Sequence, residues 1–155
     1  MRLLLVEDNV ESAELLVRLF TTTGYDVVHK THGLEGLKAA REEQFDAILL
    51  DFNLPDIDGS QIGLLLRPTL KNVPIIALTS HTDKITRNKA KVFGFNAFIP
   101  KPWSVVDLME VLKTLTSTDN INGQGFIEIV EAKLTTQEIK AITTPSDNTV
   151  SSSAS

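Results

Sequence analysis

The chain of 155 residues contains no cysteine, and this absence excludes several kinds of chemistry. Without thiols the chain can form no disulfide framework, no thiolate metal site and no cysteine nucleophile. Its three histidines, His29, His32 and His81, show no spacing typical of a zinc site, so zinc chemistry is not expected either. The remaining candidates for a reactive site are carboxylates, hydroxyls and amines.

Positive charge and long apolar runs are also scarce. The net charge of −5 argues against nucleic acid as a direct partner, because phosphate backbones are bound by clustered Lys and Arg. No apolar stretch approaches the length of a membrane span. The first apolar run, residues 2–6, leads straight into Glu7 and Asp8 and therefore does not resemble a signal peptide. These features predict a cytoplasmic protein that contacts neither nucleic acid nor membrane.

Short apolar runs alternate with longer amphipathic stretches along most of the chain. This alternation is typical of repeated βα units around a parallel sheet. Three runs are almost wholly apolar, as expected for central strands covered on both faces: 3–6, 48–50 and 75–78. Residues 25–30 are more polar and suit a strand nearer the edge, and residues 97–100 complete the set of five. The pattern predicts an α/β fold with helices on both faces of the sheet.

Five helices are predicted, one after each strand. Asn9 can cap the first, which ends at Gly24, and Ser104 with Asp107 has the spacing of a capping box for the last. The second, third and fourth are expected near residues 34–40, 60–66 and 83–93. The apolar residues on all five helices are interpreted as core, among them Leu34, Leu64, Leu66, Val105 and Met109.

The regular pattern ends near residue 117, which predicts a domain over 1–117 and a largely flexible C-terminal extension over 118–155. Within the extension, 126–130 could form a short strand and 135–142 a short helix. Together these elements could serve as a dimer arm, a partner-docking strand or a loosely packed extension. The Ser- and Thr-rich end, 143–155, is expected to be disordered.

Charged and hydroxyl side chains follow the predicted strands at the points where the strands end. Glu7 and Asp8 follow the first, Asp51 the third, Thr79 the fourth and Lys101 the fifth. Ligands of open α/β sheets bind at the carboxyl ends of the strands, so these groups are expected to form one pocket. Carboxylate and carbonyl oxygens suit Mg²⁺, which bridges phosphate oxygens. The pocket could therefore hold a magnesium ion and a phosphoryl group.

Asp51 is the candidate nucleophile of this pocket. A carboxylate can attack a phosphoryl group when a cation offsets the charge. Lys101 could neutralise one phosphoryl oxygen, and the Thr79 hydroxyl could donate to another. The stretch after Asp51 is rich in turn formers, and Asp58 is interpreted as turn chemistry with Gly59. Neither Asp58 nor Asp56 is expected to act in catalysis.

Residues 1 to about 117 resemble the receiver domain of two-component response regulators, in particular stand-alone receivers like the chemotaxis regulators. The resemblance implies a doubly wound (βα)5, flavodoxin-like parallel sheet with strand order 2-1-3-4-5. It rests on several motifs at strand ends: Glu7-Asp8, Asp51 with Asn53-Leu54-Pro55 and Asp58-Gly59, Thr79-Ser80, and Lys101-Pro102.

The resemblance assigns roles to the acidic residues and to Asn53. Asp51 would be the phosphoacceptor. Asp8 and Asp51 would bind Mg²⁺ directly, together with the backbone carbonyl of Asn53, and Glu7 would act on the metal through water.

It also assigns roles around the phosphoryl group. Thr79 and Lys101 would hold the phosphoryl group, with Thr79 moving toward it, and Phe98 occupies the aromatic switch position. Phe98 lacks the hydroxyl of the more common Tyr, so a switch here would work by packing alone. The Lys101-Pro102 bond would be cis. His81 is interpreted as an exposed loop histidine, with tuning of dephosphorylation as the alternative.

The implied function is a phosphorylation-dependent switch. A sensor histidine kinase or a histidine phosphotransfer protein would supply the phosphoryl group, and a downstream protein target would read the modified state. The chain would catalyse only its own phosphorylation and autodephosphorylation, so it is not expected to be an enzyme. A homodimer through the last two helices and the fifth strand is also possible. Receivers commonly use this surface for output, and Trp103 could either pack against its neighbours or contribute to the surface.

Two other functions compete with this one. The first is a receiver-like interaction module that is never phosphorylated, against which the complete pocket argues. The second is a phosphohydrolase similar to the haloacid dehalogenase superfamily. That superfamily needs a second Asp two residues after the nucleophile, where this chain has Asn53.

Overall fold

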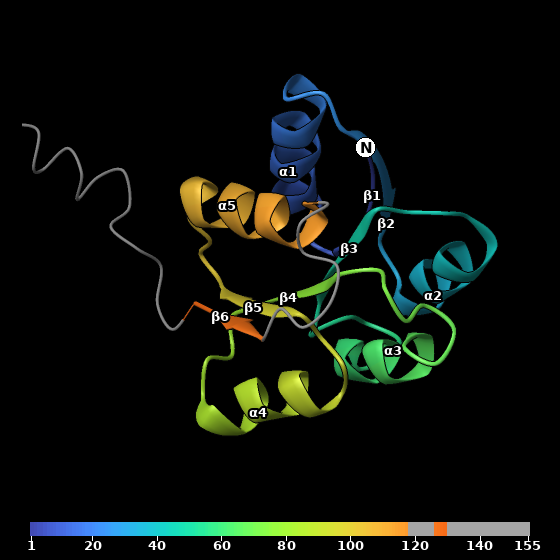
Figure 1. The fold of residues 1–155 in the computed structure, drawn as a ribbon, viewed down its shortest axis with the longest axis vertical. Coiled ribbons are helices and arrows are strands. Elements are labelled where there is room, and N and C mark those ends of the chain that lie inside the picture. The colour runs from blue at the N-terminus through green and yellow to red at the C-terminus, as the bar shows by residue number, and fades with distance from the viewer. Residues whose placement is uncertain (118–125, 130–155) are drawn as a thin grey trace, which may run out of the picture.

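The structure, a computed structural model, describes residues 1–117 and 126–129. One parallel sheet with the order β2-β1-β3-β4-β5-β6 forms the centre of the molecule (Figure 1). The predicted order 2-1-3-4-5 is confirmed, and a short sixth strand extends the sheet beyond β5. The strands are β1 (Arg2–Val6), β2 (Asp26–Lys30), β3 (Ala47–Asp51), β4 (Ile75–Thr79), β5 (Ala97–Pro100) and β6 (Ile127–Glu128).

Helices cover both faces of the sheet. Figure 1 shows α1 and α5 on one face and α2, α3 and α4 on the other. Because successive strand residues point to opposite faces, each central strand contributes to two separate cores. Leu4 and Leu50 belong to the core beneath α2–α4, whereas Leu5 and Leu49 belong to the core beneath α1 and α5. The helices are α1 (Val10–Thr22), α2 (Gly33–Glu42), α3 (Gly59–Leu66), α4 (Lys84–Val92) and α5 (Val105–Thr116).

The predicted helix ends are confirmed at α1 and α5. The Asn9 side chain accepts a hydrogen bond from the Ser12 N–H at 2.8 Å, which satisfies a free donor in the first turn of α1. After this helix the chain turns at Gly24, whose φ of 97° is one that glycine adopts without strain. At α5 the Ser104 hydroxyl accepts from the Asp107 N–H at 3.3 Å.

Three residues predicted as core are instead exposed to solvent. Leu34 is 54% exposed, Leu64 50% and Val105 46%. Leu34 and Val105 lie in the first turns of their helices, near the edge where the strands end. Leu64 lies on the outer side of α3, away from the buried Leu66. Helical spacing alone places these residues on or beside the apolar stripe of each helix. They stay exposed because the sheet does not extend beneath the whole stripe.

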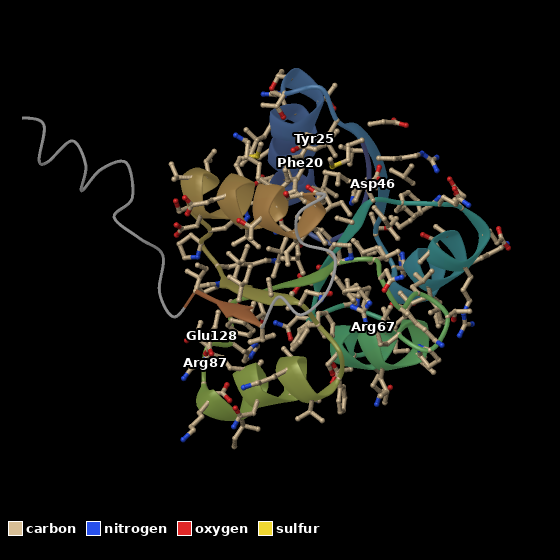
Figure 2. The ribbon with its side chains drawn as sticks, in the orientation of Figure 1. Phe20, Tyr25, Asp46, Arg67, Arg87 and Glu128 are labelled. Carbon is tan, nitrogen blue, oxygen red and sulfur yellow. The ribbon has the colours of Figure 1, made fainter. Side chains whose placement is uncertain are left out.

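Arg67, directly after α3, fixes the opposite edge of the sheet, where β4 and β5 begin. Its guanidinium donates to the Gly94 carbonyl at 2.7 Å and to the Asn96 side-chain oxygen at 2.8 Å (Figure 2). The same group donates to the Val73 carbonyl at 2.9 Å. These bonds tie the segments that lead into β4 and β5 to the end of α3.

Two acidic side chains hold the loop between β3 and α3. Asp56 accepts from the backbone N–H groups of Gly33 and Leu34 at 2.8 and 2.9 Å, and so caps α2 from another part of the chain. Asp58 caps α3 by accepting from the Ser60 N–H at 3.0 Å, and it also pairs with Lys89 of α4 at 3.0 Å. The loop that follows Asp51 is thereby attached to three helices.

The sixth strand lies within the predicted strand 126–130. Ile127 of β6 pairs in parallel register with Ala97 of β5. The predicted helix 135–142 and the predicted disordered end 143–155 lie outside the described residues, and the division at residue 117 stays a prediction. Among the residues that the structure describes, no helix is long and apolar enough to cross a membrane.

Gly59 gives a testable consequence of close packing behind Asp51. A Cβ atom at this position would lie 2.0 Å from the backbone oxygen of Asp51. We expect Gly59→Ala to lower the free energy of unfolding by about 1–3 kcal/mol, as overpacking does, and to shift the amide NMR signals of residues 51–53. Urea denaturation and amide spectra measure both effects.

The matched control is Gly24→Ala. Its Cβ would meet no atom within 4 Å, but the positive φ costs about 1–2 kcal/mol. It should lower stability without shifting the signals of residues 51–53. A Gly59→Ala protein with wild-type stability and unshifted signals would contradict the packing.

Asp56 gives a pH-dependent consequence. Burial opposes its charge, but the backbone hydrogen bonds from Leu34 and Gly33 outweigh this and lower the pKa of Asp56. Its carboxylate therefore stabilises the fold above the ordinary carboxyl pKa, and this contribution is lost as the pH falls through the lowered value. We expect Asp56→Asn to lower the urea midpoint at pH 7, with the difference from wild type shrinking toward pH 3.

Glu42→Gln, the same change in the last turn of α2, is the control and should leave the midpoint nearly unchanged at both pH values. An equal loss for Asp56→Asn at pH 7 and at low pH would mean that the Asp56 charge does not hold α2.

Candidate functional site

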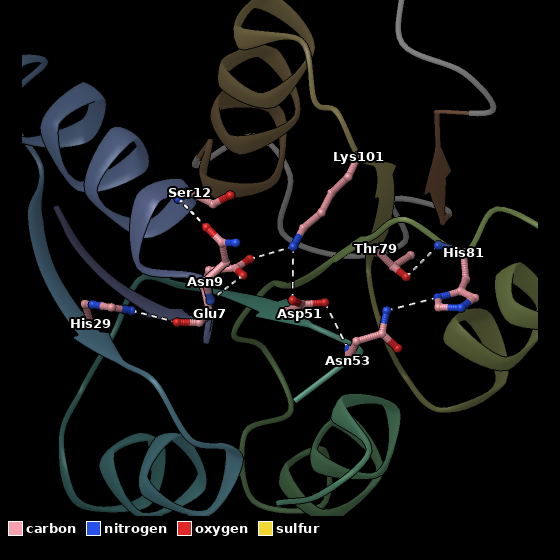
Figure 3. A network of polar contacts seen from close by, with 9 residues as sticks. All are labelled: Glu7, Asn9, Ser12, His29, Asp51, Asn53, Thr79, His81 and Lys101. Carbon is pink, nitrogen blue, oxygen red and sulfur yellow. Dashed lines mark hydrogen bonds and ion pairs between the residues drawn. The ribbon is translucent and has the colours of Figure 1, made fainter. Parts of the chain in front are cut away.

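The carboxyl ends of β1, β3, β4 and β5 bring the predicted site residues to one edge of the sheet (Figure 3). Glu7 directly follows β1, Asp51 and Thr79 are the last residues of β3 and β4, and Lys101 directly follows β5. Glu7, Asp51 and Thr79 are buried, and Lys101 is partly buried. Apolar strands force these side chains to emerge together, because all four strands run in the same direction.

The Lys101 ammonium lies between two buried carboxylates. Its Nζ atom donates to Glu7 Oε2 at 2.7 Å and to Asp51 Oδ2 at 3.0 Å. Burial acts to lower the pKa of Lys101, but the hydrogen bonds to the two carboxylates outweigh it and raise that pKa. The lysine is therefore a fixed positive charge in the pocket.

Glu7 remains electrostatically strained in spite of this pairing. Its burial raises its pKa, and the nearby Asp51 charge raises it further, whereas hydrogen bonds from Lys101 and from the Asn9 N–H lower it. The net direction is upward, chiefly because burial removes the Glu7 carboxylate from water, and the Asp51 charge adds to this. A second cation in the pocket would relieve the remaining repulsion.

Asp8 completes an acidic trio suited to such a cation. Ligand atoms of Glu7, Asp8 and Asp51 can all lie within 4.8 Å of one another, and Asp8 is exposed to solvent. Among the described residues, this is the one cluster of three or more such groups that could hold a metal ion. Hard carboxylate oxygens with an open, solvated side fit Mg²⁺, which keeps several of its waters.

Asn53 orients Asp51 through its backbone and faces His81 with its side chain. The Asn53 N–H donates to Asp51 Oδ1 at 2.9 Å, and its Nδ2 lies 2.9 Å from His81 Nδ1. The two Asp51 oxygens thus have different partners, Asn53 on one and Lys101 on the other. His81 is exposed as predicted, but it is joined to the loop after Asp51 rather than isolated.

Thr79 faces a cleft between the loops that follow β3 and β4. Its hydroxyl oxygen accepts from the His81 N–H at 3.0 Å. The cleft has a volume of about 420 Å³ and is lined by Asn53, Asp58, Thr79, His81 and Lys89, among others. Its lining includes Asn53, whose N–H donates to Asp51.

The residues around the end of β5 agree with the expected geometry. Phe98 is fully buried beneath α2–α4 and lies three residues before Lys101. The Lys101-Pro102 bond is cis, as predicted. Trp103 is half-buried and packs against the core beneath α1 and α5, which supports the packing interpretation of this residue.

One further contact at the site was not predicted. His29 of β2 places its Nε2 atom 2.8 Å from the backbone carbonyl of Glu7, and so holds the strand end that carries the acidic pair (Figure 3). The polar composition of residues 25–30 marked an edge strand but did not indicate this bond. The pairing of β1 with β2 creates it, since Leu5 lies opposite His29.

Comparison with known proteins places this geometry in a family. Residues 3–113 match the family model of the response regulator receiver domain. The polar-differentiation response regulator DivK of Brucella anthropi is 34% identical over 113 residues, which are 72% of this chain and 92% of DivK. The probable transcriptional regulatory protein SilR of Salmonella typhimurium is 32% identical over 120 residues, 77% of this chain, but this chain spans only about half of SilR (53%).

A solved structure links the family to the metal. The receiver domain of the sensor histidine kinase PA1611 from Pseudomonas aeruginosa PAO1 holds a magnesium ion in its active-site cleft. It is 29% identical to this chain, with a TM-score of 0.70 and coverage of 76% of this chain and 98% of that one. On the family model, the relatives and the site geometry together, this chain belongs to the response regulator receiver domains of two-component signalling.

Proposed function

We propose that Asp51 is the phosphoacceptor of this receiver domain. The observation that carries the proposal is a buried carboxylate whose two oxygens are held by Asn53 and Lys101, next to the acidic pair Glu7 and Asp8. Receiver domains are not conventional enzymes, so the expected reaction is a modification of the chain itself. Burial and fixed partners orient Asp51 for in-line attack before a donor arrives.

The transfer can be written with this chain's own groups. An oxygen of Asp51 attacks the phosphorus of a phosphohistidine, the P–N bond breaks, and its electron pair stays on the imidazole nitrogen, which is protonated from solvent. Lys101 donates to a phosphoryl oxygen as a point charge, and the Thr79 hydroxyl turns to donate to another. Asn53 keeps the attacking carboxylate in place through its N–H.

Glu7, Asp8, Asp51 and the backbone carbonyl of Asn53 would hold Mg²⁺ beside the acceptor. When bound, the ion supplies positive charge that offsets the carboxylates and the phosphoryl oxygens. The ligand atoms of Glu7, Asp8 and Asp51, which all lie within 4.8 Å of one another, support this assignment.

A receiver domain implies a histidine kinase as partner. A histidine phosphotransfer protein is the alternative phosphoryl donor, and a downstream protein target binds the modified form. The proposed compartment is the cytoplasm, where ATP is available to the kinase as the source of the phosphoryl group. Thr79 and Phe98 would switch between two packings as the acceptor is modified. We also propose that the chain can form a homodimer through α4, β5 and α5.

The proposal predicts a modification that depends on Asp51. Incubation with acetyl phosphate and Mg²⁺ should add one phosphoryl group in intact-mass spectra, and Asp51→Asn should abolish the adduct because the amide oxygen is a poor nucleophile. Removing Mg²⁺ with EDTA should also abolish it. Asp56→Asn, the same change in the same loop, should keep the adduct.

No adduct on the wild-type chain, together with no binding of the analogue beryllofluoride, would overturn the proposal. The domain would then be an interaction module that works without phosphorylation. An adduct that persists in Asp51→Asn would mean that another residue is the phosphoacceptor, although the chain would still belong to the receiver family.

A further inference from the structure

The outer edge of β5 is occupied by a segment far along the chain, residues 126–129. The Ile127 N–H donates to the Asn96 carbonyl at 2.9 Å, and the Ile129 N–H donates to the Phe98 carbonyl at 3.0 Å. Without this segment, β5 would present a row of unpaired backbone groups between α4 and α5. The edge is therefore a surface that binds an extended strand.

Side chains of the segment alternate between the two faces, as in a regular strand. Phe126 packs against the core beneath α2–α4, and Ile127 and Ile129 pack against the core beneath α1 and α5. Glu128 points back to the α4 side, where it pairs with Arg87 at 2.5 Å (Figure 2). The edge thus accepts an apolar–apolar–acidic–apolar segment in the parallel direction.

Arg87 also connects this edge to the site at Asp51. Its guanidinium donates to the Thr82 carbonyl in the loop between β4 and α4. The same loop carries His81, whose N–H is held by the Thr79 hydroxyl. A Thr79 hydroxyl that turns toward a phosphoryl group changes this loop, and the loop positions the guanidinium that holds Glu128.

Phe98 provides a second connection. It lies opposite Glu128 in the strand register, and its carbonyl is one of the two acceptors that hold the segment. The backbone of the proposed switch residue is thus also part of the strand-binding edge. Only two residues of the segment form regular strand, so few contacts must break for it to leave.

We propose that residues 126–129 are a built-in ligand of the β5 edge, which phosphorylation releases so that an extended, apolar–acidic–apolar segment of a partner protein can pair there. The release rests on the proposed function, whereas occupancy of the edge in the unmodified chain does not. In the unmodified protein the segment keeps the surface of α4, β5 and α5 closed.

Hydrogen exchange on the full chain tests the release. The amides of Ile127 and Ile129 should be protected in the unmodified protein, and Mg²⁺ with beryllofluoride should raise their exchange rates by about tenfold. Fluorine NMR shows independently whether the analogue is bound at Asp51. Bound analogue with unchanged exchange overturns the inference alone; absence of bound analogue overturns the proposed function and the release with it.

Reversal of the charges on Arg87 and Glu128 tests the contribution of their ion pair. Arg87→Glu should raise exchange at Ile127 and Ile129 about twofold to fivefold, the range expected of a partly exposed pair. The double variant Arg87→Glu with Glu128→Arg should restore protection. Lys84→Glu, the same charge change on an exposed residue of α4, should have no effect. Equal effects of Arg87→Glu and Lys84→Glu would contradict the role of the pair.

A labelled peptide with the sequence of residues 124–131 tests the chemistry of the partner. It should bind the beryllofluoride form at least about tenfold more tightly than the unmodified chain, because the edge is then free. The same peptide with Lys in place of Glu128 should bind more weakly to both. Equal affinity of the first peptide for both forms, or no binding to either, overturns the docking of a partner strand.

Discussion

The pairing of one ammonium with two buried carboxylates is the interaction on which the site depends. Glu7 and Lys101 are 94 residues apart in the sequence, and Lys101 is 50 residues from Asp51. Carboxylates this close repel one another strongly in a partly buried pocket. The Lys101 ammonium offsets part of this repulsion by donating to Glu7 at 2.7 Å and to Asp51 at 3.0 Å.

The parallel topology brings the site residues to one edge of the sheet, and the loops after the strands fix the orientation of Asp51. Four strands of one direction deliver their terminal side chains to a single edge, whichever helices connect them. Asp56 and Asp58 then fix the loop after Asp51 to α2, α3 and α4, and Gly59 allows α3 to begin against the Asp51 backbone. The Asp51 carboxylate is consequently held by a backbone N–H, and its orientation does not depend on its own rotamer alone.

Apolar runs and helix caps made much of this fold predictable. The five strands, the cap at Asn9 and the gathering of Glu7, Asp51 and Lys101 follow from patterns within short stretches of sequence. Polar contacts that do not lie at strand ends were not predictable, because nothing local links Asp56 to α2 or Arg87 to Glu128. Leu34 shows the converse limit: helical spacing placed it in the core, but burial depends on how far the sheet extends beneath the helix.

One strand joins the site to the occupied edge. The carboxyl end of β5 leads directly to Lys101, whose N–H donates to the Thr79 carbonyl at 2.8 Å, while the outer side of β5 pairs with β6. Under the proposed function, a phosphoryl group on Asp51 would share the Lys101 ammonium and the Thr79 hydroxyl with their present partners. Because close-packed interiors transmit strain, we infer that such a change would reach the elements packed around β5. Within the described residues the shortest strand of the sheet is β6, which makes it the element most readily displaced.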